Sequence, residues 1–155
     1  MTYLARWRWF VERFRRKAAR NLKAVAKRSI SDPEILSRTI NDKDTLPLFS
    51  TMLLSTYDRM DQRLAGTKND IEISRTASYP LENLAVPVLI VHGTQDRLVP
   101  FKIHAKMYES RIRNATLLAV DGGEQVAIFT HRNFVRTNAS TFMQRTFQPG
   151  RLGSK

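Results

Sequence analysis

The sequence predicts a chain of the α/β class, helical throughout its first half and alternating between strands and helices in its second. Residues 1–78 contain amphipathic stretches but no strand-like run. The continuous β-branched and apolar run at 87–91 and the mainly apolar run at 115–120 are typical of strands that are buried on both faces of a parallel sheet. A helical stretch at about 101–111 lies between them, so the three segments make a strand-helix-strand crossover with parallel strands.

Composition excludes several classes of site. The chain has 155 residues, 42% of them hydrophobic, which is enough for one ordinary core. It has no cysteine and three scattered histidines, so we expect no disulfide, no thiolate nucleophile and no metal centre. No apolar run approaches the roughly 20 residues of a membrane-spanning helix, and residues 1–28 lack the apolar centre of a secretory signal. We therefore expect a cytoplasmic protein, either soluble or peripheral to a membrane.

Positive charge is concentrated at the N-terminus, in residues 1–28, which we call the basic segment. It contains ten Lys or Arg and one acid, Glu12, and so carries nine of the chain's twelve net positive charges. The spacing predicts one amphipathic helix with most cations outside an apolar stripe. The stripe consists of Trp7, Phe10, Val11, Phe14, Ala18, Leu22 and Val25.

Four interpretations of the basic segment are open. The helix could pack its aromatic stripe on its own protein and keep its cations in water, which is the commonest outcome for such a helix. It could instead lie on an anionic membrane with Trp and Phe in the interface, or contact a phosphate backbone. An Arg-rich, acid-poor segment is also compatible with an organellar transit peptide, although Ser enrichment is lacking.

Three further helices are predicted before residue 78. Ser31-Asp32-Pro33-Glu34 has the capping oxygen, early proline and early carboxylate of a helix start. Asp44 is predicted to cap a long helix that ends at Gly66, and Asn69 or Asp70 to begin a weaker one that reaches about residue 75. The apolar positions of the long helix are Leu46, Phe49, Leu53, Tyr57, Met60 and Leu64.

The character of the chain changes at Tyr79-Pro80, where the alternating region begins. We predict a helical segment at 1–78, an α/β segment at 79–147 and a flexible tail at 148–155. Two parallel strands are marginal alone, because parallel strands need cover on both faces. The predicted sheet therefore requires strands that these residues do not supply.

The strand motifs resemble one family. Residues 86–96, VPVLIVHGTQD, with LVP at 98–100, resemble the seventh strand and acid loop of α/β hydrolases, which implies that Asp96 is the acid of a catalytic triad. Residues 115–129 resemble the eighth strand and the following turn, where the family carries its catalytic His; the matching position here is Gln125. Residues 5–78 are similar in layout to the lid of many members. The resemblance thus implies the C-terminal part of an α/β hydrolase fold.

The rest of the triad is missing from this sequence. A Ser hydroxyl needs an imidazole base, and the carboxylate orients that base; Gln125 cannot accept and return a proton near neutral pH. The six glycines contain no G-x-S-x-G nucleophile elbow, and there is no His-Gly-Gly oxyanion segment. The resemblance implies a partial or inactive serine hydrolase for carboxylic esters or related acyl substrates, with no cofactor.

Several candidate residues also have structural interpretations. Asp96 follows a strand in a Gly-x-x-Asp loop, where it could simply cap that loop or the next helix. His131 lies six residues after Gln125. We expect its side chain to be packed or to face solvent, and a catalytic base moved to this position is a minor alternative. We expect His104 to lie at the surface or to face the lid. For His92, packing at the end of a strand explains the residue as well as a chemical role does.

Three functional hypotheses follow. The first is the lid and C-terminal portion of an α/β hydrolase, a truncated or split gene product without the nucleophile half. The second is a pseudoenzyme that binds a complementary chain supplying the nucleophile Ser, or that keeps a ligand pocket without turnover. The third is a protein that acts through its basic segment at a membrane surface; nucleic acid is not expected as a partner, because the rest of the chain resembles no nucleic-acid-reading module.

Overall fold

The computed structural model describes residues 2–147, and the predicted flexible tail, 148–155, lies outside these residues. The chain divides into a first unit, Met1–Tyr79, and a second unit, Pro80–Lys155. Each unit is described by itself below.

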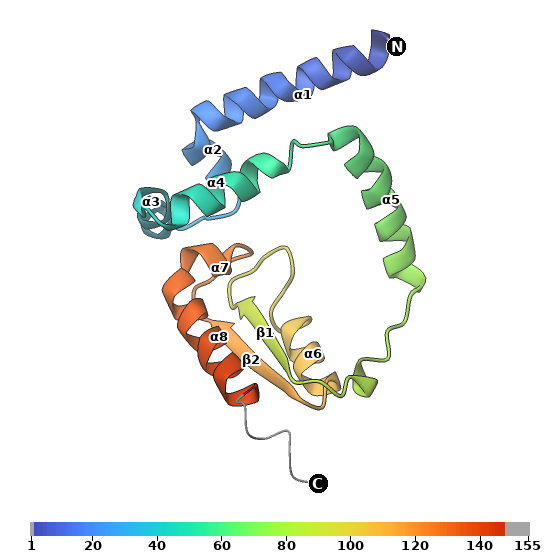
Figure 1. Ribbon diagram of the computed structural model, residues 1–155, viewed down its shortest axis with the longest axis vertical. Helices are drawn as coiled ribbons and strands as arrows, with labels where there is room; N and C mark the ends of the chain where they lie inside the picture. The colour runs from blue at the N-terminus through green and yellow to red at the C-terminus, as the bar shows by residue number, and fades with distance from the viewer. Residues whose placement is uncertain (1, 148–155) are drawn as a thin grey trace. The chain divides into compact units, whose positions relative to one another are not determined.

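The first unit is helical throughout its described residues, as the sequence predicts (Figure 1). Its helices are α1 (Thr2–Arg20), α2 (Leu22–Ala26), α3 (Pro33–Asn41), α4 (Thr45–Ser55) and α5 (Met60–Thr76). Helix α4 contacts α1, α2 and α3, and its Phe49 is fully buried at the centre of this group. The apolar side chains buried with it are Ala18, Ala26, Ile30, Leu36 and Leu53.

Carboxylate and amide side chains begin three of these helices. Asp32 caps α3 as predicted, because its Oδ1 accepts hydrogen bonds from the backbone N–H groups of Glu34 (2.8 Å) and Ile35 (2.9 Å). The predicted cap of α4 is wrong: Asp42, not Asp44, accepts from the Thr45 N–H at 2.6 Å. Asn21 interrupts the single helix predicted for the basic segment, since its side chain caps α2.

The long helix predicted from Asp44 to Gly66 is also wrong. Helix α4 ends at Ser55, Arg59 adopts a left-handed conformation (φ 50°), and α5 starts at Met60. The hydroxyls of Ser55 and Thr56 donate to carbonyls of the last turn of α4, which competes with continuation of the helix. Helix α5 then runs through Gly66, because glycine within a helix costs only about 1 kcal/mol. The separate weak helix predicted to start at Asn69 or Asp70 is therefore part of α5.

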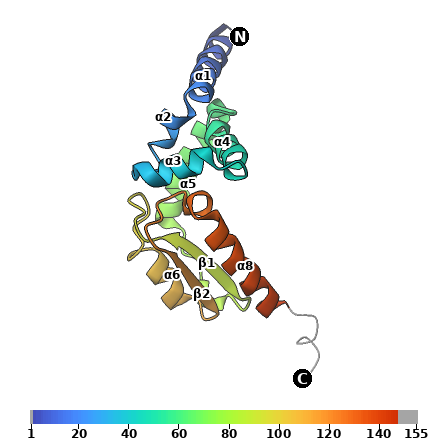
Figure 2. The same cartoon turned by 90° about the vertical axis from the view of Figure 1, so that its left-hand side faces the viewer.

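The second unit contains the predicted parallel strands. Its elements are η1 (Leu81–Asn83), β1 (Val88–Gly93), α6 (Ala105–Arg111), β2 (Ala115–Val120), α7 (Ala127–Thr130) and α8 (Arg132–Thr146). Strands β1 and β2 pair in parallel, in a register that runs from Val88 opposite Ala115 to Gly93 opposite Val120. Figure 2 shows α6 and α8 on opposite sides of this sheet, and both helices contact both strands. The predicted α/β class is confirmed, although α6 begins four residues later than predicted, after a turn at 101–104.

The sheet is less buried than the sequence predicts. The first five residues of β1 are only half-buried, and Thr116 and Ala119 of β2 are exposed. The described residues supply no third strand. Val88 donates its N–H to the carbonyl oxygen of Asn114, on the side of β2. Successive residues of a strand direct their backbone N–H and C=O groups to opposite edges, so those of Leu89 and Val91 point away from β2. That edge of β1 is unpaired by the described strands.

One ion pair joins two elements of the second unit. Nε of Arg111, at the end of α6, donates to Oε1 of Glu82 in η1 at 2.7 Å. This hydrogen bond lowers the pKa of Glu82 below its ordinary value and raises the pKa of Arg111. Both side chains are largely exposed, so the contribution of the pair to stability is small and sensitive to salt.

Two neighbouring positions of α4 test the core of the first unit. Phe49→Ala should lower the free energy of unfolding by about 3–5 kcal/mol, because it empties a fully buried site. Leu48→Ala, where the side chain is 54% exposed, is the matched control and should cost no more than about 0.5 kcal/mol. Urea unfolding followed by circular dichroism measures both. Equal losses would contradict the packing described here.

The Glu82–Arg111 pair predicts a pH dependence. Because the folded-state pKa of Glu82 is lowered, the stabilisation is present above the unfolded-state pKa and disappears as the pH falls through the folded-state pKa. Glu82→Gln should therefore shift the urea midpoint slightly downward at pH 7 and not at strongly acidic pH. Glu72→Gln, at an exposed position of α5, serves as the control. A shift that grows on acidification would have the wrong sign.

Candidate active site

The loops that follow β1 and β2 meet at one edge of the sheet. Parallel pairing places the carboxyl ends of both strands there, and the backbone then continues the contact. Thr94 donates its N–H to the Val120 carbonyl at 3.0 Å, and Gln95 donates to the Gly123 carbonyl at 2.8 Å. The loop that carries Asp96 is thus fixed to the turn that leads to Gln125.

The Thr94 side chain adds two bonds between these loops. Its hydroxyl donates to Oδ1 of Asp121 at 3.3 Å and accepts from the Gly122 N–H at 3.0 Å. Gly122 has φ +67°, a left-handed conformation that glycine adopts without the penalty of a Cβ atom. Thr94 is not among the site residues predicted from the sequence. The pattern that could have indicated it is a Gly-Thr pair at the end of one strand and an Asp-Gly-Gly turn after the next strand.

Gly93 makes the closest backbone approach between the two loops. A Cβ atom at this position would overlap the backbone carbonyls of Gly123 and Glu124. Glycine is required here by space and not by backbone conformation, since Gly93 lies in strand β1. The predicted end of the first strand, His92-Gly93, is therefore the point where β1 comes closest to the turn that follows β2.

Asp96 is held by its own loop. Its Oδ1 accepts hydrogen bonds from the N–H groups of Leu98 and Val99, both at 2.9 Å, and its own N–H donates to the Gly93 carbonyl. The side chain is partly buried. Its Oδ2 makes no hydrogen bond to a described residue, so one carboxylate oxygen orients the group and the other is available. The interpretation of Asp96 as the cap of its own loop is confirmed. It is compatible with a catalytic role, because the loop uses only Oδ1.

Gln125 lies on the turn after β2, where its side chain is exposed. It forms no hydrogen bond with any residue that the structure describes, Asp96 included. The loops that carry Asp96 and Gln125 are therefore joined through Thr94, Gln95 and Gly123 and not through the two predicted site residues themselves.

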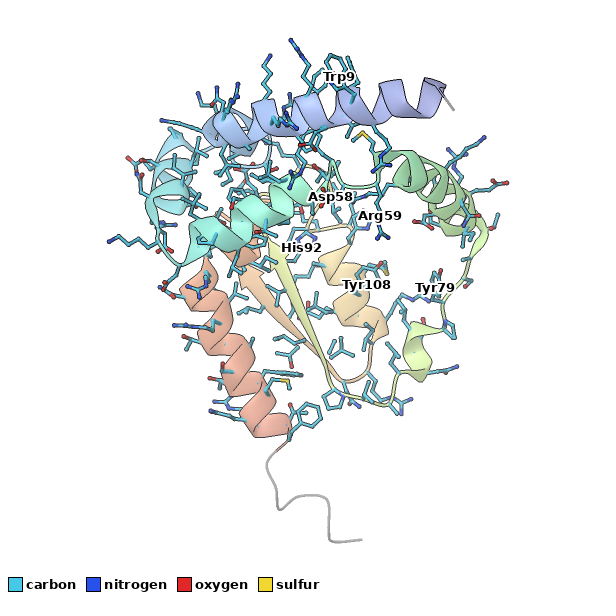
Figure 3. The ribbon with its side chains drawn as sticks, turned by 45° about the horizontal axis from the view of Figure 1, so that its top comes forward. Trp9, Asp58, Arg59, Tyr79, His92 and Tyr108 are labelled. Carbon is cyan, nitrogen blue, oxygen red and sulfur yellow. The ribbon has the colours of Figure 1, made fainter. Side chains whose placement is uncertain are left out.

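The histidines have local partners. Nδ1 of His92 lies 2.9 Å from the carbonyl oxygen of Gly93, and its ring packs edge-on against Phe101; Figure 3 shows His92 at the carboxyl end of β1. Nδ1 of His131 lies 2.9 Å from the Thr130 hydroxyl. His104 is half-buried at the start of α6. No hydrogen bond between Asp96 and a histidine occurs in the described part of the chain.

The residues that the structure describes contain no cluster of three His, Cys, Asp or Glu side chains suited to a metal ion. None of their helices combines the length and the apolar character needed to cross a bilayer.

The chain is similar over part of its length to known proteins. Over 64 residues, the chain is 34% identical to a Synechocystis sp. protein named "Putative non-heme chloroperoxidase". The match covers 41% of this chain and 23% of that protein, so the chain spans less than a quarter of its relative. The relative belongs to the α/β hydrolase family, and the match supports a hydrolase-type fold for part of the chain. No protein-family profile and no solved structure matches the chain.

Gly93→Ala tests the junction between the two loops. The added methyl group meets rigid backbone, so we expect a loss of about 1–3 kcal/mol in the free energy of unfolding. Gly66→Ala is the matched control: the space around Gly66 in α5 is open, and this change should stabilise the helix by up to about 1 kcal/mol. Urea unfolding compares the two variants. Unchanged stability in Gly93→Ala would contradict the close approach.

Proposed function

We propose that the second unit supplies the acid-bearing part of a hydrolase catalytic face, with Asp96 in the acid position and Gln125 in the position of the base. The observation that carries the proposal is the fixed Asp96 carboxylate at the carboxyl edge of the parallel strands. Its loop is hydrogen-bonded to the turn of Gln125. The partial match to a hydrolase-family protein supports a hydrolase-type fold for part of the chain.

The geometry of Asp96 suits the orienting role of a triad acid. Such a carboxylate accepts the Nδ1–H of an imidazole, fixes its tautomer and stabilises the imidazolium that forms when the nucleophile loses its proton. In Asp96, Oδ1 is occupied by two backbone N–H groups, and Oδ2 remains available for that Nδ1–H. With Gln125 in the base position, the carboxylate has no imidazole to orient, so in this proposal the chain alone does not turn over substrate.

The proposal assigns the nucleophile to a complementary chain or segment. A Ser at a strand-to-helix elbow would belong to a strand of the same sheet. The edge of β1 at Leu89 and Val91 offers backbone donors and acceptors to such a strand. The first unit corresponds to the lid of many hydrolases, and the substrates would be carboxylic esters or related acyl compounds.

A noncatalytic role is the second candidate. The exposed Gln125 side chain offers two N–H donors and a carbonyl acceptor at the position where a hydrolase needs a proton acceptor. Such a group would hydrogen-bond a ligand carbonyl without accepting a proton. A pseudoenzyme of this kind would bind an acyl ligand at the same edge of the sheet.

The activity of the isolated chain is the first test. The wild-type chain should hydrolyse p-nitrophenyl butyrate no faster than its Gln125→Ala variant, and a fluorophosphonate probe should leave both unlabelled. Gln125→His should also be inactive alone, because it restores a base without a nucleophile. Saturable turnover by the wild type that is lost in Asp96→Asn would contradict the assignment of Gln125 to an empty base position.

A hybrid enzyme tests the Asp96 assignment itself. The part of the Synechocystis protein that corresponds to residues 86–129 of this chain would be replaced by these residues, and the hybrid assayed for ester hydrolysis. Activity should depend on Gln125→His and should then fall about 10⁴-fold on Asp96→Asn. Asp121→Asn is the matched carboxylate control on the neighbouring loop. A folded hybrid in which both Asn variants behave alike would show that Asp96 is not the acid.

A further inference from the structure

One side of helix α1 packs against its own unit. Ala18 is buried, Val11 is half-buried, and the helix contacts α2 and α4. On the same side, Nε of Arg15 pairs with Oδ1 of Asp58 at 3.4 Å. This side of the helix is fixed against the unit, and the rest of the helix surface is available for another interaction.

The arc of the helix that runs from Trp9 round to Phe14, which lies next to the Ala18 side, carries large aromatic side chains in contact with solvent. Trp9 is 65% exposed, Phe10 47% and Phe14 46%, and the rings of the two phenylalanines lie 4.7 Å apart. Figure 3 shows Trp9 directed away from α4. Phe10 and Phe14 of the predicted aromatic stripe are thus only about half covered by their own unit. Three exposed aromatics within two turns are typical of an interaction surface.

Cations lie among these aromatics. At about 100° per residue, Arg13, Lys17 and Arg20 project within the arc between Trp9 and Phe14. A shallow hollow of about 410 Å³ is lined by Trp9, Glu12, Arg13, Arg16, Lys17 and Arg20. Glu12 pairs with Arg16 at 3.1 Å, whereas Arg13, Lys17 and Arg20 form no ion pair with a described acidic residue. The Arg13 guanidinium lies 5.8 Å from the centre of the Trp9 ring.

We propose that this outer side of α1, defined by Trp9, Phe10, Arg13, Phe14, Lys17 and Arg20, binds the surface of an anionic lipid membrane. Charge complementarity selects an anionic partner. The aromatics select lipid over a phosphate backbone, because Trp and Phe rings enter the interfacial region while long cations reach the headgroups. In this proposal the helix lies in the plane of the surface, and none of the described helices is suited to spanning a bilayer. The proposal is independent of the assignment of Asp96.

Vesicle binding of the full chain tests this surface. The chain should co-sediment with vesicles of three parts phosphatidylcholine and one part phosphatidylglycerol, and not with phosphatidylcholine alone. Binding should weaken from about 0.1 M to about 1 M NaCl, as the screening length falls from about 10 Å to about 3 Å. In a Trp7→Phe background, Trp9 is the only tryptophan, and its emission should shift to the blue on binding.

Matched variants separate the two parts of the surface. Replacing Arg13, Lys17 and Arg20 by Gln should weaken binding about 100-fold, at about fivefold for each cation. The charge-matched control replaces Lys43, Lys68 and Arg75, which are exposed elsewhere in the first unit, and should change binding only a few-fold. Trp9→Ser with Phe14→Ser should weaken vesicle binding without changing the net charge.

Two results would overturn the proposal. Equal loss of binding in the charge-matched control would show that only net charge matters and that no particular surface is used. Tighter binding to a 20-base-pair DNA duplex than to the anionic vesicles, unaffected by the Trp9 and Phe14 changes, would assign the surface to nucleic acid instead. Circular dichroism of each variant confirms that the helices are retained.

Discussion

Parallel pairing of β1 with β2 is the constraint on which the rest of the second unit depends. It brings the carboxyl ends of two strands to one edge, and a loop and a turn far apart in sequence become neighbours there. Thr94 then bonds across to Asp121 and Gly122, and Gly93 passes against the backbone of Gly123. Without this pairing, the Asp96 loop would be an ordinary surface turn with no fixed relation to the turn of Gln125.

The same pairing explains why the sheet looks incomplete. Each strand of a two-stranded parallel sheet has a free edge, so β1 keeps backbone groups at Leu89 and Val91 that the described strands do not satisfy. Helices α6 and α8 cover the two faces but cannot cover an edge. The meeting of the two loops at the carboxyl edge and the unpaired strand edge beside it are therefore two consequences of one arrangement.

The first unit shows how one helix serves two environments. The inner side of α1 is neutral or ion-paired, as the Arg15–Asp58 bridge illustrates, while the outer side combines aromatics with unneutralised cations. Amphipathic spacing alone places the aromatics and the cations on a helix. It does not show which side packs, because burial of Ala18 and exposure of Phe14 depend on where α4 lies.

The sequence by itself determined the class of the fold, the positions of both strands, the Asp32 cap and the location of the positive charge, because these depend on side-chain chemistry within a few residues. Only the tertiary structure decided where long-range partners lie. The Glu82–Arg111 pair spans 29 residues, and the Thr94 bonds to the β2 turn span almost as many. Such contacts follow the path of the folded chain, which local pattern does not encode.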